Sequence, residues 1–357
     1  MAWKDRHHAG AVPGSHRRGA ASAAPWGRIR RRHGTGDATA RAALAAGRRA
    51  VLSGLGAALL PAAAAGDEGS PAVEVAPGLF VLPGVHEEAS TANLNAIANV
   101  GFVVGAAAVA VVDPGGSLRH GRRLRRAIAA ATDRPIRHLV LTHVHPDHVM
   151  GAAAFADLEG VEVVGHVGLP AALAQRHRFY AAMLAREMGA EAAEGSAPLA
   201  PTRLVAPGRD LALELGGGRR LLVTAHPPAH TDHDLSLLDL ETGTLCLSDL
   251  LFVERIPALE GSLPGWQRVL EGLQALPRIA RAVPGHGPPA VAWPEGAAPL
   301  LRYLQALERD VRAALAAGLD LAEATARAAG APPVGWRLAE AYHGRNAAAA
   351  YRELEWE

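Results

Sequence analysis

The most informative stretch of the sequence is Thr142-His143-Val144-His145-Pro146-Asp147-His148, which directly follows the apolar run Ile136–Leu141. That run is typical of a β-strand, and alternate side chains at a strand end point to the same side, so His143 and His145 face one way. A turn at Pro146 brings Asp147 and His148 back toward that side at the start of a helix. Four ligand-capable groups converge within six residues, which is a specific signal for a metal site.

Three later residues, His230, Asp249 and His286, complete the set, and each is predicted to lie where a strand ends. The strands concerned are predicted at 220–224 for His230 and 244–247 for Asp249. Loops at strand ends on a rigid scaffold are common places for functional sites. Five histidines and two aspartates offer nitrogen and oxygen but no sulfur, which suits zinc or another borderline divalent metal, and suits two ions rather than one.

The surrounding pattern predicts an α+β fold in which two β-sheets pack face to face with helices outside. Short β runs set off by Gly and Pro alternate with amphipathic segments. The expected strands are 78–82, 98–104, 108–113, 136–141, 162–164, 220–224, 235–239 and 244–247, and the expected helices are 118–131, 151–158 and 170–194. Beyond Pro294 the chain turns helical, with helices expected at 300–317 and 321–329. We therefore expect a catalytic domain at 66–293 and a C-terminal helical extension at 294–357.

The N-terminal region reads as a targeting segment. Residues 1–40 form a basic leader without periodicity, which predicts disorder, with a translation start further downstream as the alternative. Residues 41–65 contain Arg48-Arg49, the apolar Ala50–Leu60 and the small-residue run Ala62–Ala65, the order of an export signal of the twin-arginine kind. The alternative is an uncleaved amphipathic helix. We expect cleavage near Ala65, a periplasmic or otherwise exported protein, and no membrane span after cleavage, because 16 apolar residues fall short of the roughly 20 needed.

Composition narrows the classes of function. The 357 residues are 49% apolar and 20% charged, which is a globular composition. Residues 1–65 hold 11 basic and 2 acidic residues, so 66–357 hold 25 basic and 33 acidic residues, a net charge of −8. An acidic body argues against nucleic acid as a partner. Cys246, the single cysteine, excludes a disulfide framework and is expected to be a small buried residue of strand 244–247.

The order His-x-His-x-Asp-His, then His, Asp and His resembles the metallo-β-lactamase superfamily of dinuclear hydrolases, over roughly residues 74–357. Two further segments, Ser248–Trp266 and the ending His343-Gly-Arg-Asn346 with Glu353-Leu-Glu-Trp-Glu357, are similar to the branch called quinoprotein relay system zinc metallohydrolases. The resemblance implies the αβ/βα sandwich of that superfamily. It also implies two Zn²⁺ ions, with other divalent metals as alternatives.

The resemblance assigns roles to the seven residues. His143, His145 and His230 would hold the first metal, Asp147, His148 and His286 the second, and Asp249 would bridge the two. Asp147 would also orient the attacking hydroxide, which makes it the expected catalytic residue.

Departures from the family pattern concern Ser248, where Gly usually precedes the bridging Asp, and His233, where many relatives have Gly or Asn. We expect His233 to be an exposed loop residue, with a place beside the ligands or the substrate as the alternative. Asp113 is either a turn residue or a partner of a metal-binding histidine. For His166 and His226 we expect a structural or surface role rather than ligation, and we expect ordinary surface or loop residues at His86, His120, His138, His177 and His343.

The expected function is hydrolysis of an ester, lactone, thioester or related small carbonyl compound. The branch resemblance suggests association with a quinoprotein (PQQ) dehydrogenase system. Two alternatives remain: a single-iron sulfur dioxygenase of the same fold, and a non-enzymatic accessory protein of the quinoprotein system. Loops Glu194–Pro201 and Val253–Trp266 are expected to set specificity.

Overall fold

The computed structural model describes residues 71–357. The predicted leader at 1–40 and signal segment at 41–65 lie outside the described residues. Within residues 71–357, no helix is both long and apolar enough to span a membrane.

The first sheet has seven strands in the order of the sequence, and its second half is parallel. Strands β1 to β4 pair antiparallel, whereas β4, β5, β6 and β7 pair parallel. The strands are β1 Val73–Ala76, β2 Leu79–Leu82, β3 Val100–Val104, β4 Val109–Val112, β5 Ile136–Leu141, β6 Glu162–His166 and β7 Arg203–Val205. Because parallel strands end at the same edge, the residues that follow β4, β5 and β6 gather at that edge.

The second sheet has six strands in the order β13-β12-β11-β10-β9-β8. Its one parallel pair, β11 with β12, lies near the middle of the sheet. The strands are β8 Leu211–Gly216, β9 Arg219–Ala225, β10 Leu235–Asp239, β11 Thr244–Phe252, β12 Arg281–His286 and β13 Val291–Ala292.

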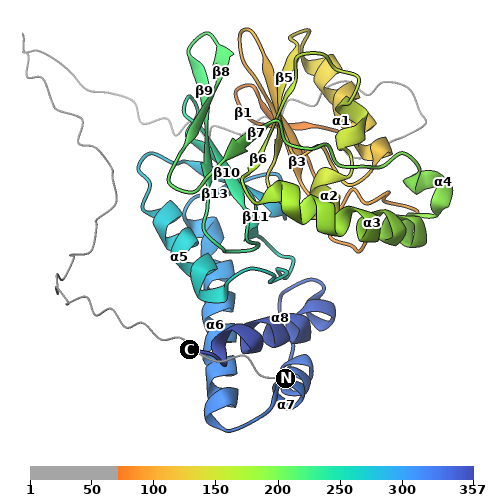
Figure 1. Ribbon diagram of the computed structural model, residues 1–357. Coiled ribbons are helices and arrows are strands. Elements are labelled where there is room, and N and C mark those ends of the chain that lie inside the picture. The colour runs from red at the N-terminus through yellow and green to blue at the C-terminus, as the bar shows by residue number, and fades with distance from the viewer. Residues whose placement is uncertain (1–70) are drawn as a thin grey trace, which may run out of the picture. The chain divides into compact units, whose positions relative to one another are not determined.

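Helices cover the outer face of each sheet (Figure 1). Helices α1 (Leu118–Ala131) and α3 (Leu169–Met188) pack on the first sheet through a core that includes Leu124 and Leu184, both fully buried. Helices α5 (Leu263–Gln274), α6 (Ala298–Ala316) and α8 (Ala339–Leu354) share a core with the second sheet. The shorter helical elements are α2 Pro146–Val149, α4 Ala190–Ala193, α7 Leu321–Ala329 and the 3₁₀ turns Ala152–Phe155 and Glu295–Ala297.

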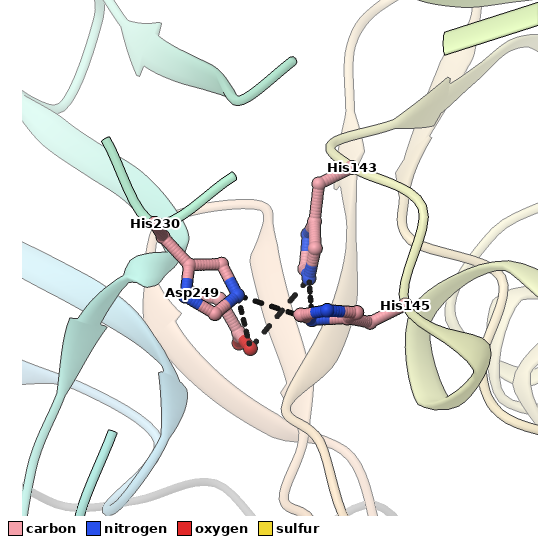
Figure 2. A group of neighbouring side chains, drawn as sticks. All are labelled: His143, His145, His230 and Asp249. Carbon is pink, nitrogen blue, oxygen red and sulfur yellow. Dashed lines mark hydrogen bonds and ion pairs between the residues drawn. The ribbon is translucent and has the colours of Figure 1, made fainter. Parts of the chain in front are cut away.

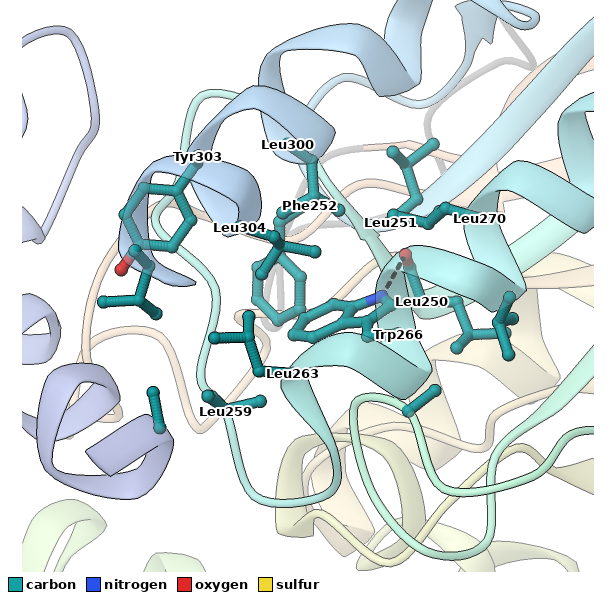
Figure 3. Packing of buried hydrophobic residues seen from close by; sticks show 14 of the residues in the cluster. Leu250, Leu251, Phe252, Leu259, Leu263, Trp266, Leu270, Leu300, Tyr303 and Leu304 are labelled. Carbon is teal, nitrogen blue, oxygen red and sulfur yellow. Dashed lines mark hydrogen bonds between the residues drawn. The ribbon is translucent and has the colours of Figure 1, made fainter. Parts of the chain in front are cut away.

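Trp266 anchors the helical layer on the second sheet. Its side chain is fully buried, and the indole Nε1 donates a hydrogen bond of 3.0 Å to the carbonyl of Leu250 in β11 (Figure 3). Phe252, Leu263 and Leu304 surround the indole ring, so β11, α5 and α6 meet at one residue. Burying a side chain of this size stabilises the fold by roughly 2–3 kcal/mol.

The predicted fold class is confirmed: two packed sheets with helices outside and a helical C-terminal extension. Three expectations were wrong in detail. The helix expected at 151–158 is only the 3₁₀ turn Ala152–Phe155, and β11 continues through Asp249 to Phe252 instead of ending at Leu247. The loop expected at Val253–Trp266 gives way to α5 at Leu263, because Ser262 caps that helix by accepting from the N–H of Gly265.

Candidate metal centre

Seven polar side chains meet where the two sheets meet, at the ends of strands from both. The first sheet supplies four of them through the turn after β5 and the start of α2, and the second sheet supplies three through the loop after β9, strand β11 and the end of β12. Each of the seven is at most 9% exposed. They are the residues expected from the sequence: His143, His145, Asp147, His148, His230, Asp249 and His286.

The first group consists of His143, His145, His230 and Asp249 (Figure 2). Nδ1 of His145 lies 3.1 Å from Nε2 of His143 and 3.1 Å from Nε2 of His230. Oδ2 of Asp249 lies 3.6 Å and 3.4 Å from the same two Nε2 atoms. Three imidazole nitrogens and one carboxylate oxygen thus point at a common position.

The second group consists of Asp147, His148 and His286, and it shares Asp249 with the first. Oδ2 of Asp147 lies 3.3 Å from Nε2 of His286 and 3.7 Å from Nε2 of His148. The other oxygen of Asp249, Oδ1, lies 3.0 Å from Nε2 of His148 and 3.5 Å from Nε2 of His286. Asp249 therefore presents one oxygen to each group.

The spacing fits two small divalent ions. Ligand atoms about 2.0–2.1 Å from a tetrahedral ion lie roughly 3.3 Å apart, and the distances in both groups run from 3.0 to 3.7 Å. Nε2 of His148 and Oδ1 of Asp249 are buried 3.0 Å apart, and neither atom has a hydrogen-bond partner outside the two ligand groups, so a cation bound there would satisfy both. The donor set of nitrogen and oxygen atoms suits zinc and similar metals.

The ring nitrogens that face away from the ligand positions have partners of their own. Nδ1 of His230 lies 2.7 Å from the carbonyl oxygen of Ala258, and Nδ1 of His286 lies 2.9 Å from that of Ile97. Nδ1 of His148 lies 2.8 Å from Oδ2 of Asp113. Such contacts fix which nitrogen of each ring is free to bind a metal.

Asp113 and Ser248 occupy left-handed backbone positions, with φ of 57° and 48°. Asp113 is buried and also accepts hydrogen bonds from Thr142 N and Oγ1 and from Ser248 Oγ. The structure therefore places Asp113 as a partner of His148. The hydroxyl of Ser248 fills the space that Gly would leave open and completes the same network.

Charged neighbours set the pKa values around the second group. Burial alone would lower the pKa of His148, but the carboxylates of Asp249, Asp147 and Asp113 outweigh it and raise this pKa well above its usual value. Burial would raise the pKa of Asp147 and Asp249, yet His148 and His286 hold both well below the usual range. Both aspartates are therefore ionised at neutral pH, as metal ligands must be.

Several histidines differ from expectation. His233 is 5% exposed rather than an exposed loop residue, and burial lowers its pKa to about 3. Its Nε2 has no hydrogen-bond partner. His120 and His343 are buried as well: Nδ1 of His120 accepts from Gly116 N, and Nδ1 of His343 lies 3.1 Å from the Tyr303 hydroxyl. His166 and His226, expected to have a structural or surface role, are both buried, and Nε2 of His226 lies 2.7 Å from Ser236 Oγ.

Sequence reasoning missed Glu260. Its Oε1 lies 3.1 Å from Nε2 of His145, and its other oxygen accepts from Arg176 of α3. Burial alone would raise the pKa of Glu260, but the contacts with His145 and Arg176 outweigh it and lower this pKa below its usual range. The only signal in the sequence was its position in the segment Val253–Trp266, which was expected to set specificity rather than to support a ligand.

The structure has two buried ligand groups that share a carboxylate at the junction of two packed sheets. This combination of fold and site is typical of a metal-binding protein. Residues 95–310 match the model of the metallo-beta-lactamase superfamily, and the chain belongs to this superfamily. Most members of that superfamily are hydrolases. No curated protein matches the chain.

Solved structures with the same fold include a metallo-beta-lactamase family protein from Thermus thermophilus, at 24% identity and a TM-score of 0.56, covering 78% of this chain and 94% of that one. A beta-lactamase domain protein from Burkholderia ambifaria has 18% identity and a TM-score of 0.58, covering 81% and 90%. The sec-alkylsulfatase Pisa1 from Pseudomonas sp. has 18% identity and a TM-score of 0.56, covering 80% of this chain but only 50% of the sulfatase. The chain thus spans about half the length of that enzyme.

Proposed function

We propose that the protein is a dinuclear zinc-dependent hydrolase that acts on an ester, lactone, thioester or related carbonyl compound. The observation that carries the proposal is the carboxylate of Asp249, whose two oxygens face two separate groups of buried ligands. A single-metal enzyme would not need a second complete group. The donor set and its spacing support zinc at both positions.

Two bound divalent ions would act as Lewis acids and lower the pKa of a shared water toward neutrality. The residues of the chain prepare for this chemistry. Asp147 is ionised, and its carboxylate at the edge of the second group can accept a hydrogen bond from that water and orient it toward the substrate. Asp113 and Ile97 hold His148 and His286 in the tautomer that leaves Nε2 free.

We further propose that the protein is exported and works beside a PQQ-dependent dehydrogenase system. Support comes from the twin arginines before Ala50–Leu60 and from the segments Ser248–Trp266 and His343–Asn346, which resemble the quinoprotein relay branch. By analogy, oxidation of alcohols in such a system yields carbonyl compounds, and any reactive acyl species formed from them would be a substrate for a hydrolase. Because Lys4 is the only lysine in the chain, Arg is the permanently cationic side chain available to bind a carboxylate on the substrate.

The test is a metal analysis combined with a substrate panel. Metal content is measured on the protein as purified, and the protein is then loaded with zinc and assayed on esters, lactones, thioesters, β-lactams and a secondary alkyl sulfate, beside Asp147→Asn and the exposed control Asp133→Asn. We expect two zinc ions per chain, turnover of a carbonyl substrate, and a loss of at least about a hundredfold in kcat/KM for Asp147→Asn only. One iron per chain would instead identify the dioxygenase. Two metals without turnover, with partner binding unaffected by Asp147→Asn, would identify the accessory protein.

Export is tested separately. A fusion of residues 1–70 to a reporter that is active only in the periplasm should give signal, and Arg48→Lys with Arg49→Lys should abolish it. The control is the same pair of substitutions at Arg17 and Arg18, which lie in the leader before the apolar run. Equal signal from both double variants would contradict a twin-arginine route.

A further inference from the structure

One loop, residues 257–263, supports the first ligand group from outside. The carbonyl oxygen of Ala258 lies 2.7 Å from Nδ1 of His230, and Oε1 of Glu260 lies 3.1 Å from Nε2 of His145. The backbone N–H groups of Glu260 and Gly261 also donate to the carbonyl of His230, at 3.1 and 2.8 Å. Both the ring and the backbone of His230 are thus fixed by this support loop.

Helix α8 in turn holds the support loop from its other side. The buried side chain of Asn346 accepts from Leu259 N at 3.1 Å and donates to the carbonyl of Pro257 at 2.8 Å. Further along α8 lies Glu353, whose two oxygens accept from Ser262 Oγ at 2.6 Å and from Leu263 N at 2.7 Å. Four hydrogen bonds from two side chains therefore span the loop from end to end.

The chain just before α8 reinforces the same contact. Ile256 N donates to the carbonyl of Arg337, and Arg337 N donates to the carbonyl of Glu254, so the segment before α8 pairs with the segment that leads into the support loop. Leu259 and Leu263 of the loop pack in the same core as Tyr303 of α6 (Figure 3). The loop is thus fastened to the C-terminal extension by polar and apolar contacts.

We propose that α8 is a working part of the metal centre, in which Asn346 and Glu353 position the support loop and, through it, His230 and His145 as ligands of the first metal. The inference rests on the proposed two-metal function. It predicts an effect on one metal only, because His148 and His286 of the second group are held by Asp113 and by the carbonyl of Ile97 instead. It also gives a role to Asn346 and Glu353, one from each of the two C-terminal segments His343–Asn346 and Glu353–Glu357.

The test measures zinc affinity by chelator competition in Glu353→Ala and Asn346→Asp. The latter places a carboxylate oxygen against the carbonyl of Pro257 without changing the size of the side chain. The matched control is Glu355→Ala, an exposed residue at the same end of α8. We expect one of two zinc ions to bind about ten- to a hundredfold more weakly in both variants, with the other ion unaffected and with the control unchanged.

The affected site is assigned by repeating Glu353→Ala in two single-site backgrounds. With His148→Ala, which leaves the first group intact, the loss of affinity should persist. With His230→Ala, which leaves the second group intact, it should vanish. A merely structural role of α8 would lower the unfolding temperature and leave both affinities equal to those of the control, which would overturn the inference. A wild-type protein that binds no metal would overturn the proposed function, and this inference with it.

Discussion

At the scale of single residues, Asp113 shows how one carboxylate can hold several neighbouring residues in place. It accepts from Thr142 N and Oγ1 and from Ser248 Oγ, and it lies 2.8 Å from Nδ1 of His148. The side chain adjoins the second group of ligands without belonging to it. Its left-handed backbone, with φ of 57°, turns the chain after β4 so that the carboxylate faces β5.

We therefore expect Asp113→Asn to weaken binding of the second metal ion and to leave binding of the first unchanged. The side-chain NH₂ group of the new asparagine cannot accept the hydrogen bonds that an oxygen of Asp113 accepts. His148 would then lose the partner that fixes its tautomer. Affinity for one zinc ion should fall about ten- to a hundredfold, measured by chelator competition, with a parallel loss of kcat/KM. Equal affinities in Asp113→Asn and Asp133→Asn would show that the carboxylate does not act on the metal.

His226 makes stability depend on pH. Burial lowers its pKa to about 4, so the folded protein holds it neutral while the unfolded chain, with a pKa near 6.5, takes up a proton first. Its contribution to stability is therefore complete above about pH 6.5 and is lost as the pH falls toward 4, by on the order of a few kcal/mol. In metal-free protein, His226→Gln should flatten the fall of the unfolding free energy between about pH 6.5 and 4. A curve parallel to that of the wild type would contradict this account.

The sequence predicted which seven side chains come together, because each lies in or shortly after a recognisable β run, while their role as metal ligands stays a prediction. It could not predict Glu260 or the burial of His233, because both depend on which loops meet in space. Glu260 lies 84 residues after its partner Arg176, and no periodicity connects them. The same holds for Asn346 and Pro257, which are 89 residues apart.

At the scale of elements, the sequence predicts the helices and strands that have a strong local pattern and misses those that depend on tertiary contacts. Helix α1 was predicted at its observed bounds because its apolar stripe repeats at helical spacing and Ser117 caps it. Helix α8, with Ala and Gly at many positions, lacks a strong stripe and is held by its contacts with α7, α6 and the support loop. Strand β11 bends at Ser248 and continues, a feature that only its pairing with β12 reveals.

The buried side chain of Arg219 forms an ion pair within the second sheet and a hydrogen bond to the first. Arg219 at the start of β9 donates through Nη2 to Asp239 of β10 at 2.6 Å and through Nη1 to the carbonyl of Val104 in β3 at 2.9 Å. Arg219→Ala would leave the buried carboxylate of Asp239 without its main partner. The unfolding free energy should fall by about 3–5 kcal/mol in chemical denaturation. The neighbouring, exposed Arg220→Ala is the control and should change it by less than about 0.5 kcal/mol.

At the scale of the whole molecule, the metal ligands come from both sheets, so the ions would tie the two halves of the sandwich together. Removing both metals with a chelator should therefore lower the unfolding temperature by on the order of ten degrees or more. Binding at roughly a thousand times the dissociation constant contributes about 4 kcal/mol per site. Differential scanning calorimetry of the loaded and stripped protein measures the change, and readdition of zinc should restore it. An unfolding temperature indifferent to chelation would mean that no metal is held at this junction.

The lone cysteine gives the sandwich a built-in reporter. Cys246 is buried between the sheets, and burial raises the pKa of its thiol to about 12, so it is not a thiolate at neutral pH and is closed to alkylating reagents. A thiol reagent should label Cys246 only when the two sheets separate, so the labelling rate measures how often they do so. Asp249 follows three residues later on the same strand. The rate at which Cys246 is labelled would therefore also report how often the shared ligand Asp249 becomes exposed.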